Sequence, residues 1–150
     1  MITVARDELR DRIVQLGLPS DLERLICTSR PKEPTDIGTI YFTDPVGILH
    51  HAWLEEGLSS QLLPIGAGFN GDPVLLDFAT ETYPIGFLCD PELYGSKTIR
   101  DCFQPCYRTL ASHMEAVERG SHTPFDYYEA REMLRLRGGE NQYLCDPSRS

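Results

Sequence analysis

The side chains best suited to bind a metal ion or to act as nucleophiles are five cysteines and four histidines. Cys102 and Cys106 are four positions apart, and His50 and His51 are adjacent. Structural zinc sites usually combine two closely spaced ligand pairs, and adjacent histidines point in different directions on a helix or a strand. No cysteine precedes a predicted helix beside a base that would lower the pKa of its thiol. We therefore expect no metal, no cofactor and no catalytic residue, and we interpret Cys102 as a core residue.

A glycine pattern found in dinucleotide-binding turns is present as Gly66, Gly68 and Gly71. In such a site a helix follows the glycines, and its N-terminus meets the pyrophosphate. Here Asp72 follows instead, before a further apolar, strand-like run. Asn70-Gly71 is the strongest short signal for a hairpin, because both central residues of a type I′ turn need a positive φ. The pattern therefore predicts a β-hairpin and not a nucleotide site.

The spacing of apolar residues predicts helices at both ends of the chain and strands in its middle. The expected elements are a helix capped at Thr3 and ended at Gly17, a helix opened by Ser20 and Glu23, a strand over 38–43, a helix from Asp44 through Trp53 to Gly57, strands over 61–66, 73–78 and 83–89, a helix from Pro105 to Gly120, and a helix from Thr123 to between 134 and 137. The three closely spaced strands indicate an antiparallel meander.

We expect a single α+β domain over residues 1–139 and a polar tail over 140–150, in which Tyr143 and Leu144 can dock. The sheet is expected to be antiparallel or mixed, with helices from the N-terminal and C-terminal segments packed on one face. The 150 residues are enough for one core. Apolar runs are too short to span a bilayer, and the charged first eight residues do not resemble a secretion signal. The first residues do not look like a signal and the number of cysteines is odd, and both observations favour reduced thiols and a cytoplasmic location.

The net charge of −9 is concentrated in the middle of the chain. Residues 31–96 contain ten acidic residues and one base, Lys32, whereas acids and bases cancel on both sides. A negative field repels nucleic acid and anionic membranes and attracts basic proteins. We therefore predict a basic protein partner, with no nucleic acid or membrane as partner. The alternative is a solvated surface that only keeps the protein soluble.

The candidate partner-binding residues are those expected to be exposed at helix ends and turns of this acidic stretch. They are Trp53, Glu55, Glu56, Asp72 and Glu81. Tryptophan is enriched among the residues that dominate binding energy at interfaces, and Trp53 precedes two acidic residues. A lone tryptophan can equally cover one side of a small core, so both interpretations of Trp53 stay open.

Two segments carry a family resemblance. One is Leu18-Pro19-Ser20-Asp21-Leu22; the other is Leu63-Pro64-Ile65-Gly66, followed by Gly71-Asp72 and Val74-Leu75-Leu76-Asp77. They resemble the Leu-Pro-x-Asp-aromatic segment and the apolar-Pro-Ile-Gly hairpin of the SUKH superfamily, the Smi/Knr-like proteins. The resemblance spans about 5–119, although Leu22 replaces the aromatic residue. It implies an α+β fold without a catalytic constellation and with no fixed binding residues. Many bacterial members are immunity proteins that neutralise toxins, often nucleases.

Together these observations predict a non-enzymatic protein-binding module. The resemblance implies an immunity protein, which we expect to neutralise a basic, nuclease-type toxin through an acidic surface, since nuclease domains are commonly basic. One alternative is a housekeeping regulatory or scaffold protein of the same fold. A more distant alternative is a small thiol or metal-dependent enzyme.

Overall fold

The computed structural model describes residues 2–27, 41–42, 45–68, 70–89, 97–119, 122–124, 126–136 and 143–144. Its elements are α1 (Ile2–Gln15), α2 (Ser20–Cys27), β1 (Tyr41–Phe42), α3 (Pro45–Leu49), α4 (Leu54–Ser59), β2 (Leu62–Ala67), β3 (Pro73–Asp77), β4 (Ile85–Leu88), the 3₁₀ turn η1 (Arg100–Cys102), β5 (Phe103–Tyr107), α6 (Leu110–Glu118) and α7 (Tyr127–Leu136). The strands form one sheet in the order β1-β2-β3-β4-β5, and every neighbouring pair is antiparallel. The predicted α+β class is confirmed, and the sheet is an antiparallel meander.

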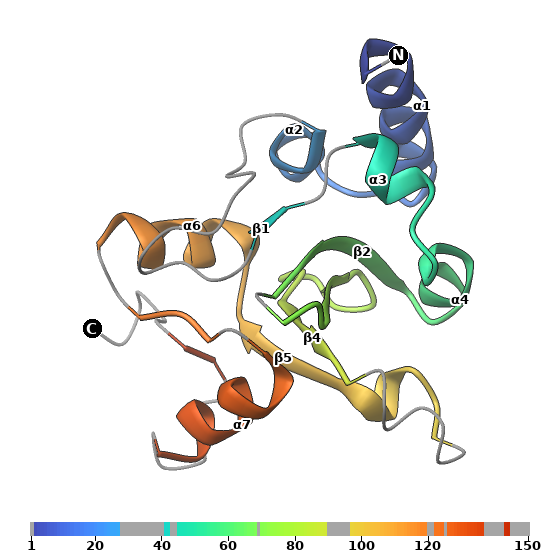
Figure 1. The fold of residues 1–150 in the computed structure, drawn as a ribbon. Coiled ribbons are helices and arrows are strands. Elements are labelled where there is room, and N and C mark those ends of the chain that lie inside the picture. Colours follow the sequence, from blue (N-terminus) through green and yellow to red (C-terminus); the bar gives the residue numbers. More distant parts are fainter. Residues whose placement is uncertain are drawn as a thin grey trace.

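Helices cover both faces of the sheet, so the expectation that they pack on one face is wrong. Figure 1 shows α1, α2 and α3 on one side of the sheet and α7 on the other. The helices α3 and α4 pack against β2, α6 packs against β5, and α7 packs against β4 and β5. All residues of β3 and β4 are buried. Continuous apolar strands of this kind fit a sheet that is covered twice, whereas a half-exposed sheet would alternate apolar and polar residues. Among the described helices, none is both long and apolar enough to cross a membrane.

The β2–β3 hairpin lies where the sequence predicts it, but its turn is of another type. Gly71 has a φ of 96°, and its N–H donates to the carbonyl of Gly68 at 3.0 Å. The N–H of Gly68 donates to the carbonyl of Asp72 at 2.8 Å, so Asn70 and Gly71 are not the two central residues of a two-residue loop and the predicted type I′ turn is wrong. The Asn70 side chain accepts instead from the N–H of Asp72 at 3.1 Å. The loop is a wider turn closed by a left-handed glycine, which is also common in hairpins.

The first half of the chain differs from the prediction at its helix ends. The helix α1 already begins at Ile2, so Thr3 is not its cap. One helix was expected from Asp44 through Trp53, but α3 and α4 are two separate short helices. Gly57 lies inside α4 and does not end it. Of the strand expected over 38–43, only β1 lies within the described residues.

The second half contains a strand that the sequence pattern does not reveal. Pro105 was expected in the first turn of a helix but lies in β5, opposite Gly86. Proline lacks an N–H and is tolerated in β5 because this strand is at the edge of the sheet. The helix α6 begins after Thr109, whose hydroxyl accepts from the N–H of Ser112 at 2.9 Å.

The last described segments are α7, which covers the face of the sheet opposite α1, α2 and α3 (Figure 1), and residues 143–144, which lie at the β5 edge. The helix α7 begins at Tyr127, later than the predicted start at Thr123, and Asp126 caps it by accepting from the N–H of Glu129 at 2.7 Å. In the tail, Leu144 is buried and donates its N–H to the carbonyl of Cys106 at 2.6 Å. This contact satisfies a carbonyl group of the edge strand, so the tail docks at this point.

Candidate functional site

The structure divides the five predicted partner-binding residues between the two ends of the sheet. Trp53, Glu55 and Glu56 lie at the start of α4, which leads into β2. Glu81 lies in the connection after β3. The last residue of β3 pairs with the first residue of β2, so Glu81 follows the end of the sheet at which α4 leads into β2. Asp72 precedes β3 and therefore lies at the opposite end, roughly 17 Å away at about 3.4 Å per strand residue. The five residues therefore do not meet at one end of the sheet.

Asp72 is half-buried and holds another part of the fold, contrary to the expectation that it is exposed. One of its carboxylate oxygens accepts from the N–H of Tyr127, the first residue of α7, at 3.0 Å. The neighbouring Asn70 donates to the carboxylate of Asp126 at 3.1 Å. The β2–β3 loop is thus tied to the start of α7, where carboxylates are favoured by the helix dipole. This gives Asp72 a structural role.

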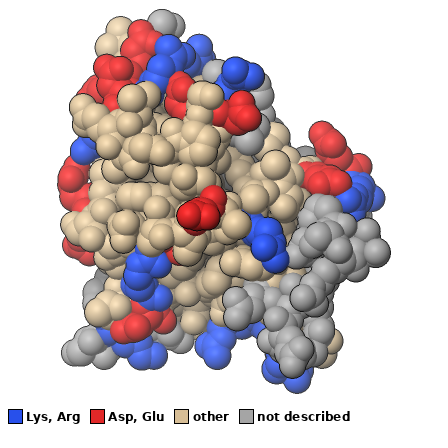
Figure 2. Space-filling view, turned by 180° about the vertical axis from the view of Figure 1, so that it is seen from behind, with Lys and Arg blue, Asp and Glu red and all other residues tan. Residues whose placement is uncertain are grey.

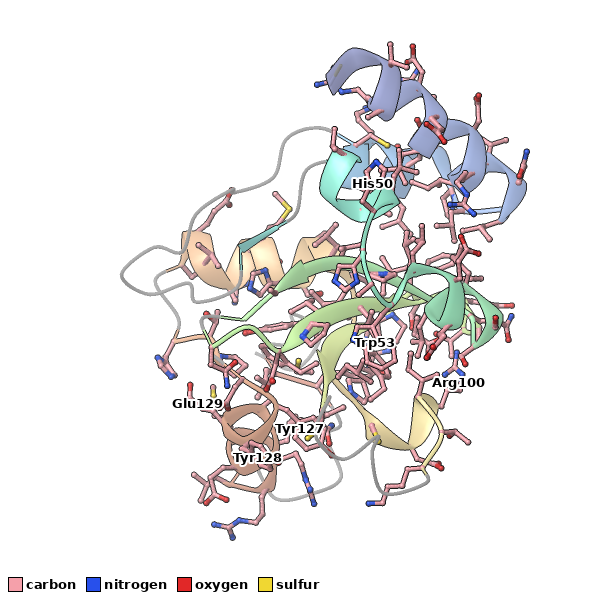
Figure 3. The ribbon with its side chains drawn as sticks, turned by 45° about the vertical axis from the view of Figure 1, so that its right-hand side comes forward. His50, Trp53, Arg100, Tyr127, Tyr128 and Glu129 are labelled. Carbon is pink, nitrogen blue, oxygen red and sulfur yellow. The ribbon has the colours of Figure 1, made fainter. Side chains whose placement is uncertain are left out.

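Trp53 is half-buried and packs against the hydrophobic core. Its backbone N–H donates to Nδ1 of His51 at 3.1 Å, which fixes the chain just before α4. Burial lowers the pKa of His51, and the adjacent His50 is exposed. Figure 3 shows Trp53 and Arg100 on one side of the molecule and Tyr127, Tyr128 and Glu129 of α7 on the other side. The packing favours the interpretation of Trp53 as a cover of the core.

Part of the negative charge of residues 31–96 is neutralised within the fold. The described acids of this stretch are Glu55, Glu56, Asp72, Asp77 and Glu81. Asp77 is buried and forms an ion pair with Arg100 at 2.8 Å, and Glu55 forms one with Arg12 at 3.3 Å. Figure 2 shows a rear face that is mostly uncharged, with one acidic group near its centre, basic groups below it and the other acidic groups toward the margins. The acidic residues of the segment do not form one continuous patch over that face.

A cavity of about 110 Å³ lies between α1, α3, α4 and β2. Its lining is apolar apart from two α1 side chains and consists of Leu9, Arg12, Ile13, Gln15, Leu16, Leu49, Leu54, Leu58 and Leu63. The residues Leu16, Leu49 and Leu58 are only half-buried, so the cavity presents apolar surface to the solvent. Sequence analysis missed this site, because the spacing of Leu9, Ile13 and Leu16 is the same for a helix that lines a cavity and for one that fills a core.

The position of α4 depends on a close approach to β2. A Cβ atom at Gly57 would lie 2.5 Å from the carbonyl oxygen of Leu62, which real side chains essentially never allow. Glycine at this position lets the helix lie directly on the first residue of the strand. Leu54 and Leu58 then face the cavity from one side, and α1 closes it from the other. The prediction that Gly57 ends a helix is therefore wrong, and its role is to allow the close approach of α4 to β2.

Exposed acidic side chains lie on the two helices that border this cavity, α1 and α4. Glu55 and Glu56 are exposed on α4, beside the lining residues Leu54 and Leu58. On α1, Glu8 lies four residues before Arg12, and Asp11 lies four before Gln15, so each exposed acid is one helical turn from a polar lining residue. We call Glu8, Asp11, Glu55 and Glu56 the acidic rim. The base beside them, Arg12, is engaged by Glu55, and their side chains are 38% and 79% exposed.

A second cavity, between α1 and α2, is less suited to a partner of one charge. Its lining is Arg10, Ser20, Glu23, Arg24 and Cys27. The Nε of Arg10 lies 2.8 Å from the carboxylate of Glu23, so opposite charges already meet within this cavity. It contains no cluster of leucine side chains comparable with that of the first cavity.

The four cysteines within the described ranges and His113 are buried. Cys27, Cys89, Cys102 and Cys106 are buried free thiols, and burial raises the pKa of Cys106 to about 12. Burial also lowers the pKa of His113 to about 4. Within the described ranges, no group of three or more histidine, cysteine, aspartate or glutamate residues could hold a metal ion. Cys102 is a core residue, as the sequence predicts.

Comparison of the chain with protein-family models, with curated proteins and with solved structures found no significant match. The function is therefore argued from the α1–α4 cavity and its acidic rim.

Proposed function

We propose that this protein is a non-enzymatic binding protein and that it binds a basic protein partner through the α1–α4 surface. The observation that carries the proposal is the combination of an apolar cavity with the acidic rim. Four exposed acids lie on the two helices that border this cavity, and the lining base Arg12 already has Glu55 as its partner. An apolar surface on helices that also carry exposed charges is an arrangement found at selective interfaces.

A negative rim acts mainly on the rate of association and on the choice of partner. Charges at the edge of an interface attract an oppositely charged protein over distances of about 10 Å at moderate salt, and they repel competitors of the same sign. A nuclease must itself be basic where it holds phosphate groups. An acidic inhibitor would therefore compete with the nucleic acid for the same basic surface. This supports the more specific proposal of a cytoplasmic immunity protein against a nuclease-type toxin, in line with the resemblance to the SUKH superfamily.

The test compares two charge-reversal variants with the same change in net charge. The rim variant carries Asp11→Lys and Glu56→Lys, and the control carries Asp21→Lys and Glu118→Lys, which are exposed acids on α2 and α6. Purified protein is used to capture partners from lysate of the source organism, and the captured protein is eluted with increasing salt. We expect one basic protein, released by salt, whose affinity falls at least about tenfold for the rim variant and changes little for the control.

Two results would contradict the proposal. One is a partner that both variants capture equally well, and the other is a partner that is acidic. The melting temperature of each variant is measured first, so that unfolding is not mistaken for lost binding. Inhibition of the captured protein's nuclease activity by the wild type then separates an immunity protein from a regulatory protein of the same fold.

A further inference from the structure

We propose that Asn70-Gly71 is a site of spontaneous covalent modification, which the folded protein holds in the amide form and whose conversion to aspartate releases the β2–β3 loop from α7. The modification is deamidation, and it consumes only water. It does not depend on the binding partner proposed above. Each of the groups that take part in the reaction forms a hydrogen bond in the structure, and these bonds decide when the reaction proceeds.

The reaction needs an asparagine followed by a residue whose backbone nitrogen is not crowded. The nitrogen of Gly71 attacks Cγ of Asn70 and forms a cyclic imide, and the bond from Cγ to the side-chain nitrogen breaks. That nitrogen leaves as ammonia with the proton of the Gly71 amide, and water then opens the ring to aspartate or isoaspartate. Glycine has no Cβ atom to hinder the attack, whereas the other asparagine, Asn141, precedes Gln142. In the unfolded chain, Asn70 is therefore the faster of the two sites.

The fold engages all three reacting groups. The attacking N–H of Gly71 donates to the carbonyl of Gly68 at 3.0 Å. The leaving amide nitrogen of Asn70 donates to Oδ2 of Asp126 at 3.1 Å, and the amide oxygen accepts from the N–H of Asp72 at 3.1 Å. The side chain must turn toward its own backbone before the attack, so the two side-chain hydrogen bonds must break first. The bond to the carboxylate of Asp126 is charge-assisted and therefore the strongest of the three.

Hydrogen bonding, and not burial, is what protects this site. Asn70 and Gly71 are both exposed, so water and base reach them in the folded protein. Asp126 is buried and is held in turn by the N–H of Glu129 at 2.7 Å, so its carboxylate is a fixed acceptor. The rate of deamidation should therefore follow how often the loop detaches from α7.

Conversion to aspartate removes a hydrogen-bond donor and places a negative charge where it stood. The amide nitrogen of Asn70 lies 3.1 Å from Oδ2 of Asp126, so an aspartate there brings two carboxylates together. Like charges this close repel each other. The same loop reaches α7 through Asp72, which accepts from the N–H of Tyr127 at 3.0 Å. The modification therefore turns a brief detachment of the loop into a lasting one.

The first test follows Asn70 in the full chain by peptide mapping and mass spectrometry during incubation at mildly alkaline pH. Asparagine, aspartate and isoaspartate at this position are separated by chromatography. We expect conversion in guanidinium chloride to be at least about tenfold faster than in the folded protein, because hydrogen bonds that include one to a charged group are lost.

A matched pair of variants assigns the protection to one bond. Asp126→Asn keeps an oxygen that can cap α7 but loses the second acceptor, and Asp21→Asn makes the same change at an exposed position on α2. Incubated below their melting temperatures, D126N should convert Asn70 about fivefold faster than the wild type, the factor that corresponds to one hydrogen bond. D21N should match the wild type.

The second test measures the effect of the product. Asn70→Asp reproduces the aspartate, and Asn70→Ser removes the amide without adding charge. Hydrogen exchange at the Tyr127 amide should be at least about fivefold faster in N70D than in N70S, because apposed like charges cost more than this factor. Added salt should reduce the difference.

Four results would overturn the inference. Equal conversion in folded and denatured protein would show that the fold does not protect Asn70, and an unreactive Asn70 in denaturant would remove the site. Equal rates in D126N and D21N would exclude the bond to Asp126 as the protecting contact. Equal exchange in N70D and N70S would show that the modification does not release the loop. The comparisons of folded with denatured wild type and of N70D with N70S decide the matter even if D126N fails to fold.

Discussion

Asp77 and Arg100 form a two-point ion pair at the end of β3. The Nη2 of Arg100 lies 2.8 Å from Oδ1 of Asp77, and its Nη1 lies 3.1 Å from Oδ2. Arg100 also donates to the carbonyl of Gln61 at 3.4 Å, and Asp77 accepts from the N–H of Ala79 at 2.9 Å. The pair therefore joins η1 to the ends of β2 and β3. The hydrogen bonds to Asp77 raise the pKa of Arg100 above its ordinary value.

We predict that Arg100→Met lowers the free energy of unfolding by about 2 kcal/mol. The substitution leaves the buried Asp77 carboxylate without its cation, and the partial exposure of Arg100 keeps the cost below that of a fully buried pair. Urea denaturation measures the effect. The control is Arg135→Met, which removes an exposed pair with Glu132 and should leave the stability almost unchanged. Equal effects of the two substitutions would show that the Asp77–Arg100 pair adds no stability.

We predict that Asp72 and Glu81, which were both expected to bind the partner, differ clearly in their effect on the free energy of unfolding. Asp72→Ala should destabilise the protein by about 1 kcal/mol, because the N–H of Tyr127 loses its acceptor at the start of α7. Glu81→Ala, at an exposed position, should stay within about 0.5 kcal/mol of the wild type. Hydrogen exchange at the Tyr127 amide is the local measurement and should become faster in D72A alone. If D72A proves as harmless as E81A, Asp72 returns to the candidates for partner binding.

The sequence predicts the three central strands well because their signal is local. Continuous apolar runs bounded by turn residues over 61–66, 73–78 and 83–89 correspond to β2, β3 and β4. The strand β5 is missed because Pro105 is incompatible with a central strand, and only the strand order makes it an edge residue. The sequence also does not reveal that both faces of the sheet are covered, because the tertiary arrangement decides which helix packs on which face.

The candidate site is less predictable than the fold because the partners of acidic residues are distant in sequence. Asp77 and Arg100 are 23 residues apart, and Arg12 and Glu55 are 43 apart. The negative charge of residues 31–96 looks unbalanced in the sequence because Arg12 and Arg100, which pair with its acids, lie outside the segment. The acidic rim likewise combines α1, whose segment has balanced charge, with α4. A charge count along the chain detects neither relationship.

We predict that at least four of the five cysteines resist a thiol reagent while the protein is folded. Cys27, Cys89, Cys102 and Cys106 are buried, and with a pKa of about 12 the Cys106 thiolate fraction at neutral pH is on the order of 10⁻⁵. Labelling with an aromatic disulfide reagent, followed by mass spectrometry, identifies the modified positions. All five should react rapidly in urea. Rapid labelling of a buried cysteine in the absence of denaturant would mean that the fold opens locally around that cysteine.

We predict that His113 makes the protein less stable as the pH falls from about 6.5 to 4. Its ring lies 4.8 Å from that of Tyr107, edge to face, and burial lowers its pKa from 6.5 to about 4. Between these values the unfolded chain binds a proton at this position and the folded protein does not. Stability is therefore fully present above pH 6.5 and decreases through the window, by up to about 3 kcal/mol for the pKa difference.

The measurement compares urea unfolding at pH 7.5 and pH 4.5 for the wild type, His113→Phe and His50→Gln. The phenylalanine keeps an aromatic ring beside Tyr107 but does not titrate, so H113F should lose about 2 kcal/mol less than the wild type between the two pH values. The exposed His50 serves as the control, and H50Q should follow the wild type. Carboxylates contribute to the loss in all three proteins and cancel in the comparison. If H113F and the wild type lose the same stability, His113 takes up its proton in the folded state as readily as in the unfolded chain.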